Sequence, residues 1–302
     1  MTILEGKVTW IDIENPQKSD IEQLKKIHDF HPIILDELLH LSARSKVEHY
    51  DSYLYTTYHF PIYDYKTKTS RRAELDILVT KDHVVTIHYE DLEPVRNFSQ
   101  QLDGNAAVKH QVLSNGGYIA YYLLQEVNSF CERELRHIEN NVAGVTKDLF
   151  AHQEYQMLQR ISYVKRDILD FGVILKPQSL LLGSLHDVGM KFWGEALGVY
   201  LKDLVGDNLK ISQQLDTFRE TIESAEETNS QLLNSKTNAV MQRFTILAFL
   251  TFPLMLFTAI FSVDLVTSGI KDPKVFWLGF GAVFVVTVAT IAIFKLKGLF
   301  RD

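Results

Sequence analysis

Side chains that could bind a metal or catalyse a reaction are spread thinly along the 302 residues. Among the eleven histidines, His28 lies close to His31 and His83 to His88, but no cysteine or carboxylate completes a convincing four-ligand zinc set with either pair. The single cysteine, Cys131, excludes an intramolecular disulfide and offers no soft-metal site. The sequence contains no phosphate-binding glycine loop and no nucleophile elbow. We therefore expect that the protein is not an enzyme.

Two long uncharged runs dominate the C-terminal part of the chain. Phe244–Val263 contains 20 residues without an ionisable side chain, and Val275–Phe294 is a second run of the same length. Each makes about 30 Å of helix, which matches the hydrocarbon core of a lipid bilayer. The sequence therefore predicts two transmembrane helices joined as a hairpin. Asp264 ends the first run, where a carboxylate either caps the connecting loop or marks the membrane–water interface.

The distribution of charge bears on partners and orientation. A net charge of -7 argues against a nucleic-acid partner, which would need a basic face. Positive residues are more frequent on the terminal sides of the two runs than between them, so we expect both termini in the cytoplasm. The terminal ones are Lys236, Arg243, Lys295, Lys297 and Arg301, against Lys271 and Lys274 between the runs. No cleavable signal peptide is recognised, which also places the large N-terminal part in the cytoplasm.

The N-terminal part of the sequence predicts a mixed α/β domain. A capping box at Ser19–Glu22 opens a helix to about His28, and Pro32 starts a second helix that reaches Leu41. Short β-branched and aromatic runs separated by polar residues predict an antiparallel or mixed sheet that helices cover. The expected strands are 8–13, 45–50, 53–60, 73–80 and 84–89.

The middle of the chain predicts long helices. Apolar residues at helical spacing predict one helix from Tyr118 to Leu149 and a second from Met157 to Leu175, which we expect to end at Pro177. A third helix begins near Trp193 and runs unbroken into the first span. Its heptad spacing predicts a seam that packs against other helices, and a stalk that needs partners for such a seam suggests a symmetric oligomer. The seam comprises Ile211, Leu215, Phe218, Ile222, Ala225, Asn229 and Leu232.

Several short motifs together resemble the CorA-type divalent cation channels of the two-transmembrane superfamily. The match covers nearly the whole chain and includes His31–Glu37, Ser45–Leu54, Glu93–Arg96 and Ser235–Met241, followed by Phe252–Leu254. The resemblance implies an α+β cytoplasmic domain built as an α/β/α sandwich, a long stalk helix and a two-helix transmembrane hairpin, in a funnel-shaped homopentamer. The corresponding regions are a cytoplasmic domain at 1–115, helices and stalk at 116–243, a pore-lining span at 244–263, an extracytoplasmic loop at 264–274, a second span at 275–294 and a basic tail at 295–302.

The chain departs from the family at the end of its first span. There the family carries a Gly-Met-Asn signature whose asparagine ring selects hydrated Mg²⁺, and this chain has Ser262, Val263 and Asp264. A ring of aspartates would supply a strong negative field, which is also a cation-selecting device. The resemblance further implies a pore-lining stripe, with apolar rings that gate by dewetting. The stripe comprises Asn238, Met241, Phe244, Thr245, Ala248, Phe252, Met255 and Ala259.

The family also senses cytoplasmic Mg²⁺ through carboxylates that bridge adjacent subunits. The matching positions are Glu90 and Asp91 beside the sheet, and Glu226 and Glu227 on the stalk. Oxygen ligands of this kind suit a hard divalent cation. The resemblance thus implies that Mg²⁺ is both the transported and the regulatory ion, with no organic cofactor.

The leading hypothesis is a passive channel for divalent cations in the inner or plasma membrane, carrying Mg²⁺ or also Co²⁺ and Ni²⁺, and gated by cytoplasmic divalent ions. One alternative is a transporter for Zn²⁺ or another cation that is coupled to protons through Asp264. A second alternative is a non-conducting membrane sensor or scaffold that has lost the selectivity filter.

Overall fold

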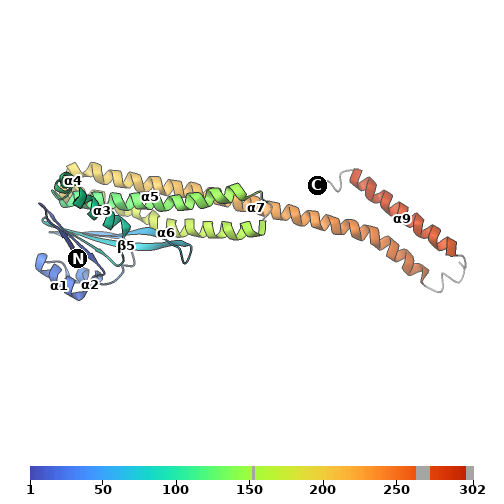
Figure 1. Ribbon diagram of the computed structural model, residues 1–302, viewed down its shortest axis with the longest axis horizontal. Helices are drawn as coiled ribbons and strands as arrows, with labels where there is room; N and C mark the ends of the chain where they lie inside the picture. The colour runs from blue at the N-terminus through green and yellow to red at the C-terminus, as the bar shows by residue number, and fades with distance from the viewer. Residues whose placement is uncertain (152–153, 263–272, 297–302) are drawn as a thin grey trace. The chain divides into compact units, whose positions relative to one another are not determined.

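The computed structural model describes residues 1–151, 154–262 and 273–296. The chain divides into two compact units, Met1–Glu226 and Glu227–Asp302. The first contains a sheet and most of the helices, and the second contains the end of one long helix and a further helix. Figure 1 labels these elements along the chain.

A six-stranded mixed sheet forms the centre of the first unit. The strands are β1 (Thr2–Leu4), β2 (Thr9–Glu14), β3 (Lys46–His49), β4 (Leu54–Asp64), β5 (Thr69–Val79) and β6 (His83–His88). Their order is β1-β2-β6-β5-β4-β3, with β2 and β6 parallel and the other pairs antiparallel. The expected mixed sheet is therefore confirmed, with β1 as an additional edge strand.

Apolar residues alternate between the two faces of this sheet, so each face is covered by helices. On one face Ile11 and Val85 belong to a cluster with α1 (Lys18–Ile27) and α2 (Pro32–Glu37). On the other face Trp10 and Val84 belong to a larger cluster with α3 (Glu93–Gly104) and the long helices. Figure 1 shows these layers on opposite sides of the strands. The layering gives the α/β/α sandwich that the family resemblance implies.

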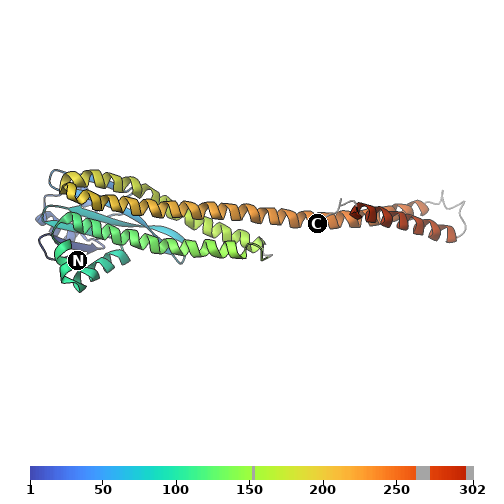
Figure 2. The same ribbon diagram turned by 90° about the horizontal axis from the view of Figure 1, so that it is seen from above.

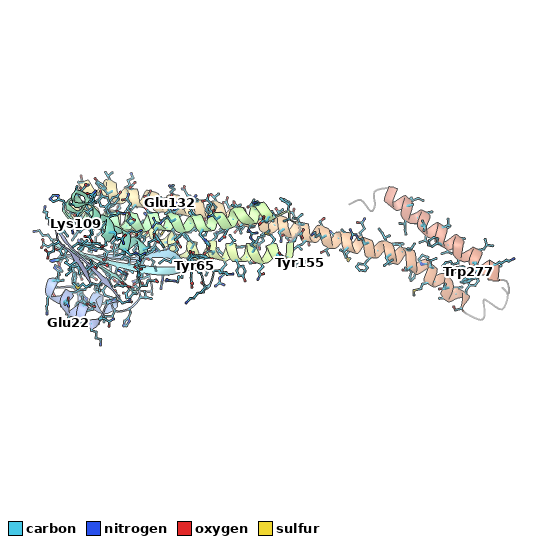
Figure 3. The ribbon with its side chains drawn as sticks, in the orientation of Figure 1. Glu22, Tyr65, Lys109, Glu132, Tyr155 and Trp277 are labelled. Atoms are coloured by element: carbon cyan, nitrogen blue, oxygen red, sulfur yellow. The ribbon has the colours of Figure 1, made fainter. Side chains whose placement is uncertain are left out.

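Three long helices cover the larger face, joined to α3 by the short α4 (Ala106–Val112). These are α5 (Gly116–Asp148), α6 (Glu154–Trp193) and, after a 3-10 turn at Glu195–Leu197, α7 (Gly198–Phe261). Up to Glu226, α7 lies beside α5 and α6, as both ribbon views show (Figures 1 and 2). Lys210 of α7 pairs with Glu132 of α5 at 3.0 Å, and Lys165 of α6 pairs with Glu226 of α7 at 2.5 Å. Figure 3 labels Glu132 on this bundle.

This packing corrects the interpretation of the heptad seam. Ile211, Leu215, Ile222 and Ala225 are buried in the same core as α5 and α6. A Cβ placed on Gly172 of α6 would lie 3.2 Å from Leu215, so the helices approach closely. The seam up to Ala225 is therefore covered by the chain's own helices and gives no evidence of contact with another subunit.

The predicted end of the second long helix at Pro177 is wrong, because α6 continues to Trp193. Proline removes one backbone donor and usually breaks a helix. Here Phe171 and Leu175 before it, and Leu182 and Leu185 after it, are all buried in the core. Packing on both sides therefore holds the helix together despite the lost hydrogen bond.

The second unit contains the last part of α7 and α9 (Pro273–Leu296). The helix α7 continues through Pro253 to Phe261. Phe257 of α7 lies 5.7 Å from Phe276 and 6.1 Å from Phe280 of α9, measured between ring centroids. By length and composition, three described helical segments could cross a membrane: Glu154–Trp193, Glu195–Phe261 and Lys274–Ile293. In the most apolar stretch of the first segment, 44% is buried within the protein, whereas the corresponding stretches of the other two are almost fully uncovered.

Candidate functional site

The expected pore-lining residues all lie on one uncovered face of α7. Met241, Phe244, Phe252 and Met255 are exposed by 64 to 71% in the single chain. The smaller members of the stripe, Asn238, Thr245, Ala248 and Ala259, are exposed as well. The stripe is thus left uncovered by every described residue of its own chain.

The opposite face of α7 packs on α9. Ile246, Leu250, Pro253, Phe257 and Phe261 are partly covered and follow each other at intervals of three or four residues. At about 100° per residue, this face lies on the far side of the helix from Ala248 and Ala259. A Cβ on Gly279 of α9 would lie 2.8 Å from the ring of Phe257, so the two helices are in close contact.

The threonine hydroxyl groups on this part of α7 donate hydrogen bonds to backbone carbonyls of the same helix. The Oγ1 of Thr245 donates to the carbonyl of Met241 at 2.9 Å, and that of Thr258 donates to Met255 at 2.9 Å. Thr251 donates to Leu247 at 3.0 Å and to Ala248 at 3.4 Å. Pro253 has no N–H to donate to the carbonyl of Phe249, and Thr251 donates to other carbonyls. Internal bonds of this kind allow hydroxyl side chains to lie in an apolar environment.

At the end of α7, the structure describes only the first residue of the candidate filter. The side chain of Ser262 donates to the carbonyl of Thr258 at 2.9 Å, and its N–H bonds to the same carbonyl at 3.0 Å. Ser262 is exposed. Val263 and Asp264 lie outside the described residues.

The four candidate sensing carboxylates already have partners within the chain. Glu90 accepts two hydrogen bonds from the guanidinium of Arg71, at 2.6 and 2.5 Å. Asp91 pairs with Arg96. On α7, Glu226 pairs with Lys165 at 2.5 Å and Glu227 accepts from Gln231 at 3.4 Å. A metal ion at these positions would therefore have to compete with ion pairs that exist in the single chain.

The histidine pairs do not form a metal centre. His83 and His88 lie at the two ends of β6, where an odd spacing places them on opposite faces of the strand. His88 contacts a carboxylate oxygen of Asp12 at 3.3 Å. His31 caps α2 by accepting from the N–H of Ile33 at 3.3 Å. Among the described residues, no three His, Cys, Asp or Glu side chains converge to hold a metal ion.

Comparison with known proteins identifies the family. A family profile described as "CorA-like Mg2+ transporter protein" matches residues 5–296. The chain belongs to the CorA-like Mg²⁺ transporter family. As a CorA-like chain it is a member of a divalent cation transporter family, and its apolar helices are long enough to span a membrane.

Relatives and solved structures agree with this membership. The CorA-like chain is 22% identical to the cobalt/magnesium transport protein CorA of Thermotoga maritima, over 85% of this chain and 73% of that protein. It is 20% identical to the protein of the same name from Methanocaldococcus jannaschii, over 97% and 91%. The solved structure of the CorA magnesium transporter from M. jannaschii covers 98% of this chain and 92% of its own, with a TM-score of 0.81 and 19% identity, which shows the shared fold.

A buried group of polar residues on β4 and β5 of the CorA-like chain was not predicted. Asp76 is fully buried, and its Oδ1 accepts from Thr57 at 2.7 Å and from Tyr55 at 3.0 Å. Its Oδ2 accepts from the hydroxyl of Tyr89 at 3.1 Å. Burial raises the pKa of Asp76 to about 7.

Glu74 is the second buried acid of this group. Both of its carboxylate oxygens accept from the N–H of Ser42, at 2.9 Å each, and His59 lies 2.8 Å from Oε2. The carboxylate thus holds the segment after α2 against the sheet. Two acidic residues at alternate positions of the otherwise apolar stretch Ala73–Val79 are a sequence signal that could have located this group.

Proposed function

We propose that the chain is a passive channel for divalent cations in the inner or plasma membrane, with Mg²⁺ as the principal ion and Co²⁺ and Ni²⁺ as further candidates. Five copies would surround a central pore that α7 lines, while α9 forms the outer ring of a two-helix hairpin. The observation that carries the proposal is the uncovered face of α7 opposite α9. The names of the relatives, which include cobalt and magnesium transport, support the choice of ion.

The residues on the uncovered face suit a gated pathway. Rings of Met241, Phe252 and Met255 would form apolar constrictions that close by dewetting. The hydroxyl of Thr245 is engaged by the backbone, so the wall presents few groups that could replace the water around an ion. Selection would then depend on the ring of Asp264 at the outer end, whose carboxylates attract cations. Both termini would lie in the cytoplasm.

Gating would act through the carboxylates that the family uses for sensing. Mg²⁺ held between Glu90 or Asp91 of one copy and Glu226 or Glu227 of the next would keep the subunits together and the pore closed. Loss of the ion would leave like charges unscreened and loosen this contact. The intrachain partners Arg71 and Lys165 would then take up the released carboxylates.

Cysteine substitution tests the pore in purified protein reconstituted in liposomes, with Mg²⁺ outside and an indicator inside. We expect uptake above that of empty vesicles. A cationic methanethiosulfonate reagent should block it in Ala248→Cys and Ala259→Cys, and leave it unchanged in the matched variant Ala289→Cys on α9. The native Cys131 is fully buried, so its own reaction contributes little. Equal block in all three variants would contradict the assignment of the pore face.

A further variant tests the filter. Asp264→Ala should keep the fold and reduce uptake by about tenfold or more, because the ring then loses the oxygen atoms that attract cations. Uptake that needs a pH gradient, carries Zn²⁺ and disappears in Asp264→Asn would instead indicate a proton-coupled transporter. No uptake of Mg²⁺, Co²⁺, Ni²⁺ or Zn²⁺ in either direction of a pH gradient would overturn the channel in favour of a sensor or scaffold.

A further inference from the structure

A pocket of about 580 Å³ lies in the first unit, where the segment that enters β3 meets the middle of α6. Val173, Pro177 and Leu181 of α6 form an apolar part of its lining, and Arg44 and Arg72 line it as well. The volume falls in the range of about 300 to 1,000 Å³ that is typical of small-molecule sites. It lies entirely within one unit and takes no part in the proposed ion pathway.

The ionisable side chains that line the pocket are all basic. Its lining contains no aspartate or glutamate. Lys46 is neutralised by Glu37 at 2.5 Å and by Glu48 at 3.4 Å. Within the described part of the chain, the guanidinium groups of Arg44 and Arg72 form no ion pair, and the one hydrogen bond of Arg72 goes to the carbonyl of Ala43 at 3.0 Å. Two positive charges are therefore left for a ligand.

The inner end of the pocket is polar and held in place. The amide nitrogen of Gln178, which is 1% exposed, donates to the Oγ of Ser45 at 2.9 Å and to the carbonyl of Ile174 at 3.0 Å. Ser45 Oγ in turn lies 2.8 Å from Nδ1 of His59, whose Nε2 lies 2.8 Å from Glu74. These groups are positioned before any ligand arrives, which lowers the entropic cost of binding.

We propose that this pocket binds a small organic phosphate of about the size of a nucleoside monophosphate. A phosphate monoester carries a charge close to -2 at neutral pH, which matches the two guanidinium groups that lack a carboxylate. Guanidinium groups also fit phosphate oxygens with paired hydrogen bonds. The apolar wall of α6 accommodates a ring, and Ser45 and Gln178, which are bonded to each other, form a fixed polar boundary beside it.

Titration calorimetry on the purified full-length protein tests this site without any measurement of transport. The probes are adenosine 5′-monophosphate, ribose 5-phosphate, inorganic phosphate and adenosine, in buffer without Mg²⁺. We expect adenosine 5′-monophosphate to bind more tightly than the other three. The double variant Arg44→Gln/Arg72→Gln should weaken binding at least tenfold. Arg166→Gln is the matched control, because Arg166 also lies on the surface and only pairs with Asp170 at 3.5 Å.

Each other result would overturn part or all of the proposal. Equal affinity for adenosine would refute the role of the anion, and equal affinity for inorganic phosphate would refute the role of the apolar wall. Unchanged binding in the double variant would place the ligand elsewhere. Absence of binding by every probe at millimolar concentration would refute the site, whether or not the protein conducts ions.

Discussion

The buried carboxyl of Asp76 makes the stability of the first unit depend on pH. Its pKa of about 7 lies above the ordinary value of 3.8 because burial disfavours the charged form. The folded state therefore binds this proton more tightly than the unfolded state does. The stabilisation is complete below the ordinary pKa and is lost as the pH rises through about 7.

The size of the effect follows from the two pKa values. A difference of about three pH units, at about 1.4 kcal/mol each, corresponds to about 4 kcal/mol of unfolding free energy lost between pH 4 and pH 7.5. Asp76→Asn should remove this loss and keep the hydrogen bonds. Its Oδ1 can still accept from Thr57 and Tyr55, and its amide can donate to Tyr89, whose hydroxyl then donates to the carbonyl of His40 at 3.0 Å.

The assay is urea unfolding of the full chain in detergent at several pH values from 5 to 8, followed by tryptophan fluorescence. Trp10 is 1% exposed and lies in the core of the first unit, so it reports on unfolding there. The difference between Asp76→Asn and the parent should grow with pH, because other titrating groups cancel. Glu22→Gln, at a mostly exposed acid, is the control and should give a constant difference. Parallel pH curves for Asp76→Asn and the parent would refute the reasoning.

Two further predictions concern regulation and the packing of the second unit. Glu227→Ala should abolish the inhibition of Mg²⁺ uptake by internal Mg²⁺. The control Glu223→Ala should retain this inhibition, because the carboxylate of Glu223 pairs with Arg219 on the same helix. Unchanged inhibition in both variants would count against the proposed sensor. Gly279→Ala should lower the stability of the protein in detergent by about 1 to 3 kcal/mol, because the new Cβ would lie 2.8 Å from Phe257. Gly281→Ala meets nothing within 4 Å and should leave the thermal midpoint unchanged, so equal melting of the two variants would contradict the helix contact.

The fold could be predicted from the sequence wherever the pattern was long and regular. The strand-forming runs in β4 and β5 and the uncharged run of α7 led to the right elements, since each keeps one residue character over many positions. The helix α3 was not predicted. Its start was recognised only as the motif at Glu93–Arg96, although Val95, Phe98 and Leu102 are buried at helical spacing. The three-residue strand β1 is too short to carry a periodic signal.

The wrong predictions about the heptad seam and Pro177 have a common physical cause. A local sequence pattern does not identify the segment that packs against it. The heptad spacing at Ile211 and Leu215 indicates that another helix covers α7, but it cannot distinguish a helix of the same chain from that of another copy. Pro177 lowers helix propensity locally, and only the tertiary packing of α6 offsets it. For the candidate site, the residues of the α7 stripe are uncovered, while their pore-lining role, the filter role of Asp264 and the sensing role of the four carboxylates stay predictions.

The bond between Ser42 and Glu74 has a consequence for which substitutions the chain can accept. The donor is a backbone N–H, which every residue except proline provides, so position 42 is free to change its side chain. The acceptor is a specific carboxylate that no other side chain of the same length reproduces with both oxygens. Random mutagenesis should therefore recover many residues at position 42 but almost none at position 74. The same amide should also exchange its hydrogen slowly, although it belongs to a loop.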